Sequence, residues 1–430
     1  MKKKRARNSI KISRVILLAA LFLFVVMILR LSQLALSKNI DGINLKELAS
    51  KRTTKTDVLP ATRGTIYTSD EEVVAQNVSS YDIIAYLDPS RTEDEDKPQH
   101  VVDKENTAKQ LAPILDMSEE EILALLSKEG IYQTEFGSKG RGLTEITKEK
   151  IEALQLPGID FIEKQKRYYP KGDFLSYTLG YAKSVVDEES QEEEIVGELG
   201  IEKYYDDILK GENGSITYQK DLKGYKIANT KEVKQDAVAG KDIYLTIDSN
   251  IQFFVEQSLK NAQSSRGFEW FTMMVADAKT GKILASSSTP SFDPNKRNLT
   301  SYLDPNIAVA YEPGSTMKIF TYMATMENGN YDGNETFLSG TYTTSDGTVI
   351  GDWNRNGWGT ITYDKGFMLS SNVGVVNLLK NKIDSKILRQ YFKKLGFGSK
   401  TGITLPQESA GKIEFKYETE IFNAGFGQGI

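Results

Sequence analysis

Near the N-terminus, the pattern of hydrophobic and polar positions predicts a membrane-spanning helix. Residues 15–29 contain no polar side chain, and seven basic residues lie among residues 2–14. A spanning helix needs about 20 residues, which the run reaches if it continues to residue 36 and Arg30 extends its charge to the outer interface. The basic flank favours a cytoplasmic N-terminus. We therefore predict a cytoplasmic basic tail over residues 1–14 and a single transmembrane anchor over residues 15–36.

A cleaved signal peptide is the alternative interpretation of the same segment. Residues 35–37 (ALS) resemble a small-x-small cleavage site. The apolar run is long for the core of a signal peptide, so the uncleaved anchor is favoured. Both interpretations place everything after residue 40 outside the cytoplasm.

The next segment, residues 40–235, mixes charged stretches with short structured pieces. The alternation of apolar and polar positions in residues 73–75 and 81–86 predicts strands. Amphipathic spacing in residues 118–127 and 201–209 predicts helices. No catalytic set stands out here, and we expect an irregular α+β domain.

A second domain is predicted to begin near Gly240. Residues 242–247 have the pattern of a strand, and a capping aspartate precedes a predicted helix over residues 251–259. Residues 272–286 predict a hairpin with its turn at residues 278–281. A loop rich in Pro, Asp and Asn follows the hairpin.

Composition and charge exclude several kinds of function. With 430 residues and 39% hydrophobic content, the chain can bury more than one core. The net charge of -5 disfavours a nucleic-acid binder. The absence of cysteine excludes disulfides and thiol nucleophiles, and the single histidine, His100, disfavours a Ser-His-Asp triad or a histidine-rich zinc site. Acid–base chemistry must therefore use Lys, Asp, Glu, Tyr or Ser.

Ser315 and Lys318, within residues 311–318 (YEPGSTMK), are the first candidates for chemistry. A serine that forms an acyl-enzyme with lysine as its base has this Ser-x-x-Lys spacing. Residues three apart share a face of a helix, so Lys318 Nζ can reach Ser315 Oγ. Burial of the first turn would lower the lysine pKa and make a neutral base available. The pattern recurs at residues 409–412, but Gly411 and a turn-like context remove the helix that would aim the lysine.

Ser370 and Asn372 form a second candidate pair, which begins 55 residues after Ser315. They lie at the junction of two helical stretches, within the sequence Ser-Ser-Asn. A helix N-cap is the alternative interpretation, because Ser and Asn are both good caps.

With these residues in place, the chain resembles the class B penicillin-binding proteins over nearly its whole length. It is most similar to division-type enzymes of Gram-positive bacteria. The resemblance rests on the segment around Ser315, on Ser370-x-Asn372 as the family's second box, and on residues 63–67 (RGTIY), 167–170 (RYYP), 197–202 (GELGIE), 395–398 (LGFG), 401–403 (TGI) and 426–429 (FGQG). It implies an α+β multidomain protein with an N-terminal transmembrane helix. An elongated α+β pedestal of the dimerisation type would occupy residues 40–235. The N-terminal part of a penicillin-binding/β-lactamase-like transpeptidase domain would occupy residues 240–430.

One departure concerns the family's third box, a Lys-Thr-Gly or Lys-Ser-Gly on the strand that flanks the cleft. Residues 279–281 and 400–402 both read Lys-Thr-Gly. The first is the turn of the predicted hairpin, and the second aligns with a family segment that follows the second box. We therefore expect the chain to be truncated inside the transpeptidase domain, and these residues alone to have little or no transpeptidase activity.

The resemblance implies a serine-type peptidoglycan D,D-transpeptidase that cross-links stem peptides outside the cell. Ser315 would be the nucleophile and Lys318 its base. No metal or organic cofactor would be required. Ser370 and Asn372 would relay the proton and hold the peptide. Trp353 would wall the cleft, although packing is the commoner role of a Trp beside an Asp.

The family also implies partners and a place in the cell. β-Lactams would acylate the same serine as covalent inhibitors. A SEDS-type glycosyltransferase and division proteins would be partners, and the protein would lie in the cell membrane, at the septum, with most of its chain extracellular.

Three alternatives stay open. A D,D-carboxypeptidase or β-lactamase would use the same boxes but would not need so large a pedestal. A β-lactam-sensing receptor would carry several membrane spans before the serine. A catalytically silent scaffold of the division machinery is compatible with the pedestal.

Overall fold

The structure is a computed structural model that describes residues 2–36, 39–40, 43–44, 53–92, 94–186, 193–220, 227, 230 and 232–430. The chain forms two compact units. One contains residues 1–61 and 211–239, and the other contains residues 62–210 and 240–430. The chain therefore leaves the larger unit after residue 210 and returns to it at residue 240.

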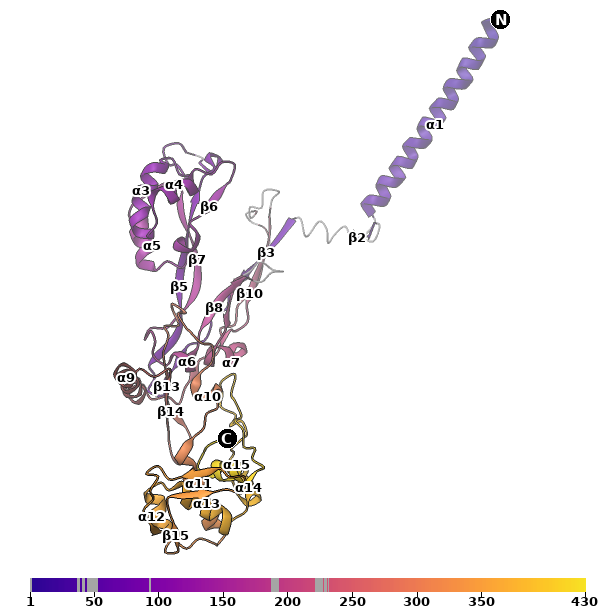
Figure 1. Cartoon of the computed structure of the whole chain (residues 1–430). Helices are drawn as coiled ribbons and strands as arrows, with labels where there is room; N and C mark the ends of the chain where they lie inside the picture. The colour runs from indigo at the N-terminus through magenta and orange to yellow at the C-terminus, as the bar shows by residue number, and fades with distance from the viewer. Residues whose placement is uncertain are drawn as a thin grey trace. The chain divides into compact units, whose positions relative to one another are not determined.

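The smaller unit contains the long N-terminal helix α1 (Lys2–Leu36) (Figure 1). Its stretch Arg14–Gln33 has a mean hydropathy of 2.8 and is long and apolar enough to cross a membrane. This confirms the helix that the hydrophobic pattern predicted. The remaining strands are β1 (Asn39–Ile40), β2 (Ile43–Asn44), β3 (Thr54–Leu59), β10 (Gly214–Gln219) and β11 (Val233–Gln235). The central strand β10 pairs with both β3 and β11, antiparallel in each case.

In the larger unit, one sheet is built around the long strand β5 (Val73–Tyr86). β5 spans residues 73–75 and 81–86, which the sequence pattern predicted as two separate strands. β7 (Ile159–Tyr168) runs antiparallel beside β5 from the Gln76–Tyr168 pair to the Ala85–Ile159 pair (Figure 1). The other members of the sheet are β4 (Ile66–Tyr67), β6 (Gln133–Glu135) and β12 (Ile243–Tyr244). β12 pairs in parallel with β4, so the chain re-enters this sheet after residue 240.

Helices cover one end of the β5–β7 pair. They are α3 (Lys104–Leu115), α4 (Glu119–Leu126) and α5 (Glu145–Glu152), with the 3-10 turns η1 (Pro89–Arg91) and η2 (Gly137–Gly140). Ser118 caps α4 through a capping box with Glu121, in agreement with the predicted helix. Leu111, Ile122 and Leu126 are fully buried in the core beneath these helices.

The other end of the sheet is held by a buried ionic network. Nearby elements are α6 (Ser176–Leu179), β8 (Ala182–Val186), β9 (Glu193–Gly197), α7 (Gly200–Tyr204) and α8 (Asp206–Leu209). The helix predicted over residues 201–209 is thus broken into two, at Tyr205. Glu202 accepts hydrogen bonds from Arg63 Nε at 2.8 Å and from Arg167 Nε at 2.6 Å. The arginines are 2% and 8% exposed and Glu202 is 0% exposed, so three sequence motifs meet in the interior.

After β12, helix α9 (Ser249–Arg266) packs on a β-hairpin. Asp248 caps the helix by accepting hydrogen bonds from Asn250 N and Ile251 N. The hairpin strands are β13 (Phe271–Ala276) and β14 (Ile283–Thr289), as predicted. The predicted strand over residues 242–247 is shorter, because only Ile243 and Tyr244 pair with β4.

The C-terminal part of the larger unit is mainly helical. Its helices are α10 (Pro305–Ala308), the 3-10 turn η3 (Gly314–Thr316), α11 (Met317–Glu327), α12 (Tyr363–Met368), α13 (Asn372–Asn381), α14 (Ser385–Lys394) and α15 (Glu418–Gly425). Two small antiparallel two-stranded sheets pair β15 (Thr336–Leu338) with β18 (Thr360–Thr362) and β16 (Thr341–Thr343) with β17 (Val349–Gly351). Apolar side chains of α11, α13, α14 and α15 share one buried cluster. This cluster fixes the helices that carry the predicted site residues.

Candidate active site

Ser315 lies in a turn that the chain enters through Gly314, whose φ of +61° is in the left-handed region. The turn η3 continues directly into α11, and the Ser315 side chain is exposed. Gly314 N donates a hydrogen bond to Gly427 O at 2.9 Å, and Gly429 N donates one to Glu312 Oε1 at 2.7 Å. The segment 426–429 therefore packs on the turn that presents Ser315.

Lys318 is on the inner face of the same first turn and is 2% exposed. Its Nζ donates hydrogen bonds to Ser370 O at 2.5 Å and to Ser370 Oγ at 3.0 Å. Among the hydrogen bonds of the described residues, none joins Lys318 to Ser315. Catalytic hydrogen bonds of this kind commonly tighten only when substrate binds.

Burial changes the protonation of Lys318. Desolvation of the ammonium lowers the pKa of Lys318 from 10.5 to about 8, and the negative charge of Asp352 acts in the opposite direction. A pKa of about 8 leaves roughly a tenth of the amines neutral at pH 7. A neutral base beside a serine hydroxyl is therefore accessible at physiological pH.

Ser370 has a strained backbone, with a φ of +53° that is uncommon for a residue with a side chain. Its N–H donates to Phe367 O at 3.0 Å, at the end of α12. The left-handed conformation turns both oxygens of Ser370 toward the Lys318 amine. The structure thus brings together two residues that are 52 positions apart.

Asn372 begins α13 and lies next to this pair. Its Nδ2 donates a hydrogen bond to Gly351 O at 2.9 Å, at the end of β17. Ser371, between the two box residues, is the N-cap of α13 and accepts from Gly374 N at 2.9 Å. The N-cap interpretation is therefore correct for Ser371, whereas the side chains of Ser370 and Asn372 bond to other parts of the chain.

Trp353 stands at the edge of the same site. Its indole Nε1 donates a hydrogen bond to Leu369 O at 3.0 Å, and its ring packs edge-on against Trp358 with 5.8 Å between centroids. The side chain is nevertheless 71% exposed. Because Trp353 is exposed and its indole is held by Leu369, the residue before Ser370, its ring is suited to contact a ligand.

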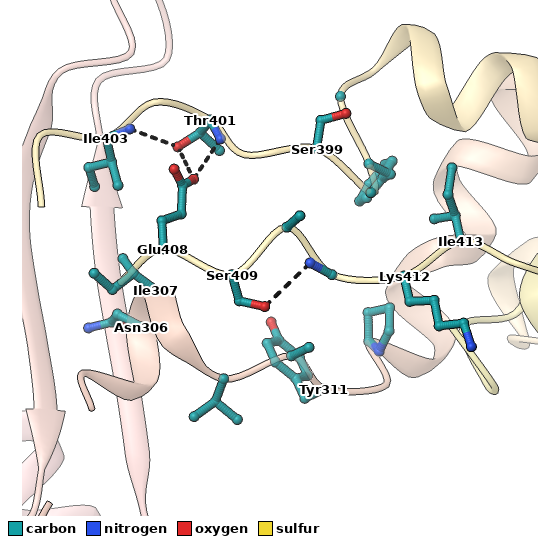
Figure 2. Close-up of a pocket in the computed structure, with 18 of the residues that line it drawn as sticks. Asn306, Ile307, Tyr311, Ser399, Thr401, Ile403, Glu408, Ser409, Lys412 and Ile413 are labelled. Carbon is teal, nitrogen blue, oxygen red and sulfur yellow. Dashed lines mark hydrogen bonds between the residues drawn. The ribbon is translucent and has the colours of Figure 1, made fainter. Parts of the chain in front are cut away.

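A cavity of about 740 Å³ lies next to the turn (Figure 2). Pro313 and Met317 are among the residues that line it, together with several residues between 395 and 413. Figure 2 shows Glu408 beside Thr401, whose N and Oγ1 each donate to Glu408 Oε1 at 2.6 Å. The four predicted catalytic residues do not line this cavity. It is therefore a neighbour of the site and not its centre.

The competing copies of the motifs have other roles. Lys412, in the second Ser-x-x-Lys, has a 72% exposed side chain in a segment without helix, and it pairs with Glu414. Thr280 lies in the β13–β14 turn, where Asp277 Oδ1 accepts from its N–H and hydroxyl. Among the described residues, no three His, Asp or Glu side chains are grouped so as to hold a metal ion.

Sequence reasoning missed the importance of Asp352. The sequence pattern drew attention to it only as the Asp beside Trp353. The structure buries it to 2% exposure, with Ser371 Oγ donating to its Oδ1 at 2.8 Å. A lone acidic residue before a Trp gives no local signal of burial. The contact between Asp352 and Ser371 could therefore be found only from the folded structure.

Two family matches cover most of the chain. Residues 58–245 match the penicillin-binding protein dimerisation domain, and residues 271–430 match the penicillin binding protein transpeptidase domain. In fold, the chain is similar to penicillin binding protein 2X from Streptococcus thermophilus. The TM-score is 0.70 and the identity 29%, over 87% of this chain and 57% of that one.

Curated relatives show the same likeness. Stage V sporulation protein D of Bacillus subtilis is 35% identical over 77% of this chain. The peptidoglycan D,D-transpeptidase MrdA of Escherichia coli is 27% identical over 85%, and penicillin-binding protein PbpB of Mycobacterium tuberculosis is 27% identical over 95%. The chain spans 51%, 62% and 60% of these three relatives, respectively.

Proposed function

Because the chain belongs to the class B penicillin-binding proteins, we propose that it carries the acylating residues of a serine-type peptidoglycan D,D-transpeptidase. The substrates are stem peptides of peptidoglycan, and the product is a cross-link between them. One observation carries the proposal. Lys318 is a buried amine that donates to Ser370 and follows Ser315 by one helical turn.

In the acylation step, Ser315 Oγ attacks the carbonyl carbon of the penultimate D-alanine, and its proton passes to neutral Lys318. The Ser315 N–H points at the developing oxyanion. Collapse of the tetrahedral intermediate breaks the amide C–N bond. Lys318 returns the proton through Ser370 Oγ to the leaving nitrogen, and the terminal D-alanine departs as an amine.

In the second step, an amino group of a neighbouring stem peptide attacks the ester carbonyl. Its proton passes to Lys318 and then to Ser315 Oγ as the ester bond breaks, which restores the enzyme and leaves the cross-link. Asn372 holds the peptide backbone, and Trp353 forms one wall. A β-lactam acylates Ser315 in the same way, but its opened ring remains attached and the ester is resolved slowly.

We propose that the reaction takes place on the outer side of the cell membrane, with the chain anchored by α1 and its N-terminus in the cytoplasm. A role at the division septum, with a SEDS-type glycosyltransferase and division proteins as partners, belongs to the same proposal. It is supported by the apolar helix and by family membership.

Labelling with a fluorescent penicillin tests the nucleophile, in the protein expressed from its complete gene. We expect the wild type to be labelled covalently and Ser315→Ala to lose the label. Ser409→Ala is the matched control, because it removes the serine of the second Ser-x-x-Lys, and it should label like the wild type. Persistent labelling of Ser315→Ala would disprove the assignment.

A further inference from the structure

We propose that Asp352 is a positioning residue for this acyl transfer, which holds the Ser370–Asn372 turn in place and provides the negative charge that acts on Lys318. This inference rests on the proposed function, because it concerns the same base and the same serine box. Among the hydrogen bonds of the described residues, none joins Asp352 to Ser315, so its role acts through its neighbours.

Both carboxylate oxygens of Asp352 are tied to the site. Oδ1 accepts hydrogen bonds from Ser371 Oγ at 2.8 Å and from Val373 N at 3.0 Å. Oδ2 accepts from Gly340 N at 2.9 Å, and the backbone N–H of Asp352 donates to Gly340 O at 2.8 Å. The carboxylate therefore joins Ser371, which lies between Ser370 and Asn372, to the loop at Gly340.

The position of Asp352 also matters electrostatically. Its carboxylate receives the N–H of Val373 in the first turn of α13, where a negative charge is stabilised by the helix dipole. Among the ion pairs of the described residues, none includes Asp352. The Asp352 carboxylate is buried and accepts hydrogen bonds only from neutral groups, so no cation neutralises its charge. Low-dielectric surroundings also screen that charge weakly.

Lys318 is the cation on which this field acts. The charge of Asp352 raises the Lys318 pKa, against the larger lowering by desolvation. Four other charged residues, on helices near α11, are engaged elsewhere. Asp364 of α12 accepts from Tyr331, Lys380 of α13 lies over the Tyr342 ring, Lys394 of α14 pairs with Glu327, and Glu418 of α15 accepts from Ser345.

Position and charge can be separated by substitution. Asp352→Asn keeps the size of the side chain and an oxygen for Ser371 and Val373, but removes the charge. Asp352→Glu keeps the charge and displaces the oxygens. Ser371→Ala removes one positioning bond and leaves the charge untouched.

The experiment is the rate of penicillin acylation between about pH 6 and pH 10, measured on the full-length protein and these three variants. The acid limb of such a profile reports the pKa of the free base. We expect the limb of Asp352→Asn to move to lower pH by about half a unit or more, since loss of a neighbouring negative charge disfavours the ammonium. Asp352→Glu and Ser371→Ala should keep the wild-type limb and acylate about tenfold or more slowly, because small misplacements are costly.

A wild-type limb in Asp352→Asn would overturn the inference, since a purely structural residue would lower the rate without moving the limb. If Asp352→Asn does not fold, as judged by thermal unfolding, the other two variants decide. A moved limb in either of them, or wild-type rates in both, would then contradict the proposal. Failure of the proposed function is distinguishable, because in that case the wild type itself would not be acylated at Ser315.

Discussion

Lys318 Nζ donates to both oxygens of Ser370, at 2.5 Å to the carbonyl and 3.0 Å to the hydroxyl. The contact satisfies two of the three donors of an ammonium that is otherwise desolvated. A charged amine in this place is a cost to folding, because burial disfavours the ionised form. Burial of Lys318 therefore lowers the stability of the fold, and it also allows the amine to lose its proton near neutral pH.

Lys318→Met is expected to stabilise the fold at pH 7 while abolishing acylation. The lowering of the pKa from 10.5 to about 8 corresponds to about 3 kcal/mol of penalty for the charged form. Methionine has a similar length and no charge, but it loses the bonds to Ser370, so we expect a net gain of about 1–3 kcal/mol. Thermal unfolding and penicillin labelling measure the two effects.

The pH dependence of this gain gives a check. The folded-state pKa is lower than the unfolded one, so the penalty in the wild type is full below about pH 8 and disappears as the pH rises toward 10.5. The advantage of Lys318→Met should therefore fall by about half or more between pH 7 and pH 9.5. Lys365→Met, at an exposed position of α12, is the control and should change stability little at either pH. A pH-independent gain would contradict the assigned cause.

Ser370→Gly should slow acylation without destabilising the protein. Glycine adopts the φ of +53° without strain but has no hydroxyl to relay a proton. We expect a loss of about 10²-fold or more in the acylation rate. Ser370→Ala lacks the same hydroxyl and keeps the strain, so its rate should match that of Ser370→Gly while its unfolding midpoint is lower. Wild-type acylation in both variants would remove Ser370 from the proton path.

Local patterns predicted the parts of the fold that local interactions decide. Ser118 and Asp248 begin helices because their side chains can cap the first turn. The hairpin around residues 278–281 follows from its turn residues. The spacing predicted that Lys318 would reach Ser315, whereas the structure places the Lys318 amine in contact with Ser370.

Such local patterns do not predict contacts between distant segments. β12 pairs with β4, across more than 170 positions, and only the fold determines which strand edge is free. The left-handed φ of Ser370 depends on the ends of two helices that meet there. Three motifs were recognised around Arg63, Arg167 and Glu202, but no spacing rule predicts that one carboxylate joins both guanidinium groups.

Glu202→Gln should destabilise the larger unit strongly. The substitution leaves two buried guanidinium groups without their shared carboxylate, and breaking a buried pair in this way costs about 3–5 kcal/mol. Asp206 still partners one of the two arginines, because its Oδ1 accepts from Arg63 Nη1 at 2.7 Å. Thermal unfolding measures the loss. The control is Glu198→Gln, which removes a partly exposed partner of Lys183 and should cost less than about 1 kcal/mol. Equal midpoints for the two variants would show that the network is not important for stability.

Gly427→Ala should disable acylation through the turn that presents Ser315. A Cβ on Gly427 would lie 2.1 Å from Gly314 O, so the two segments must separate. A displacement of about 1 Å at a nucleophile costs roughly 10²-fold in rate. Gly429→Ala is a close control, because its φ of +72° resembles the +82° of Gly427 but a Cβ there meets nothing within 4 Å. Both variants share the backbone strain of about 1–2 kcal/mol, so a selective loss of penicillin labelling in Gly427→Ala isolates the contact with Gly314. Equal labelling of the two variants would show that the contact does not position Ser315.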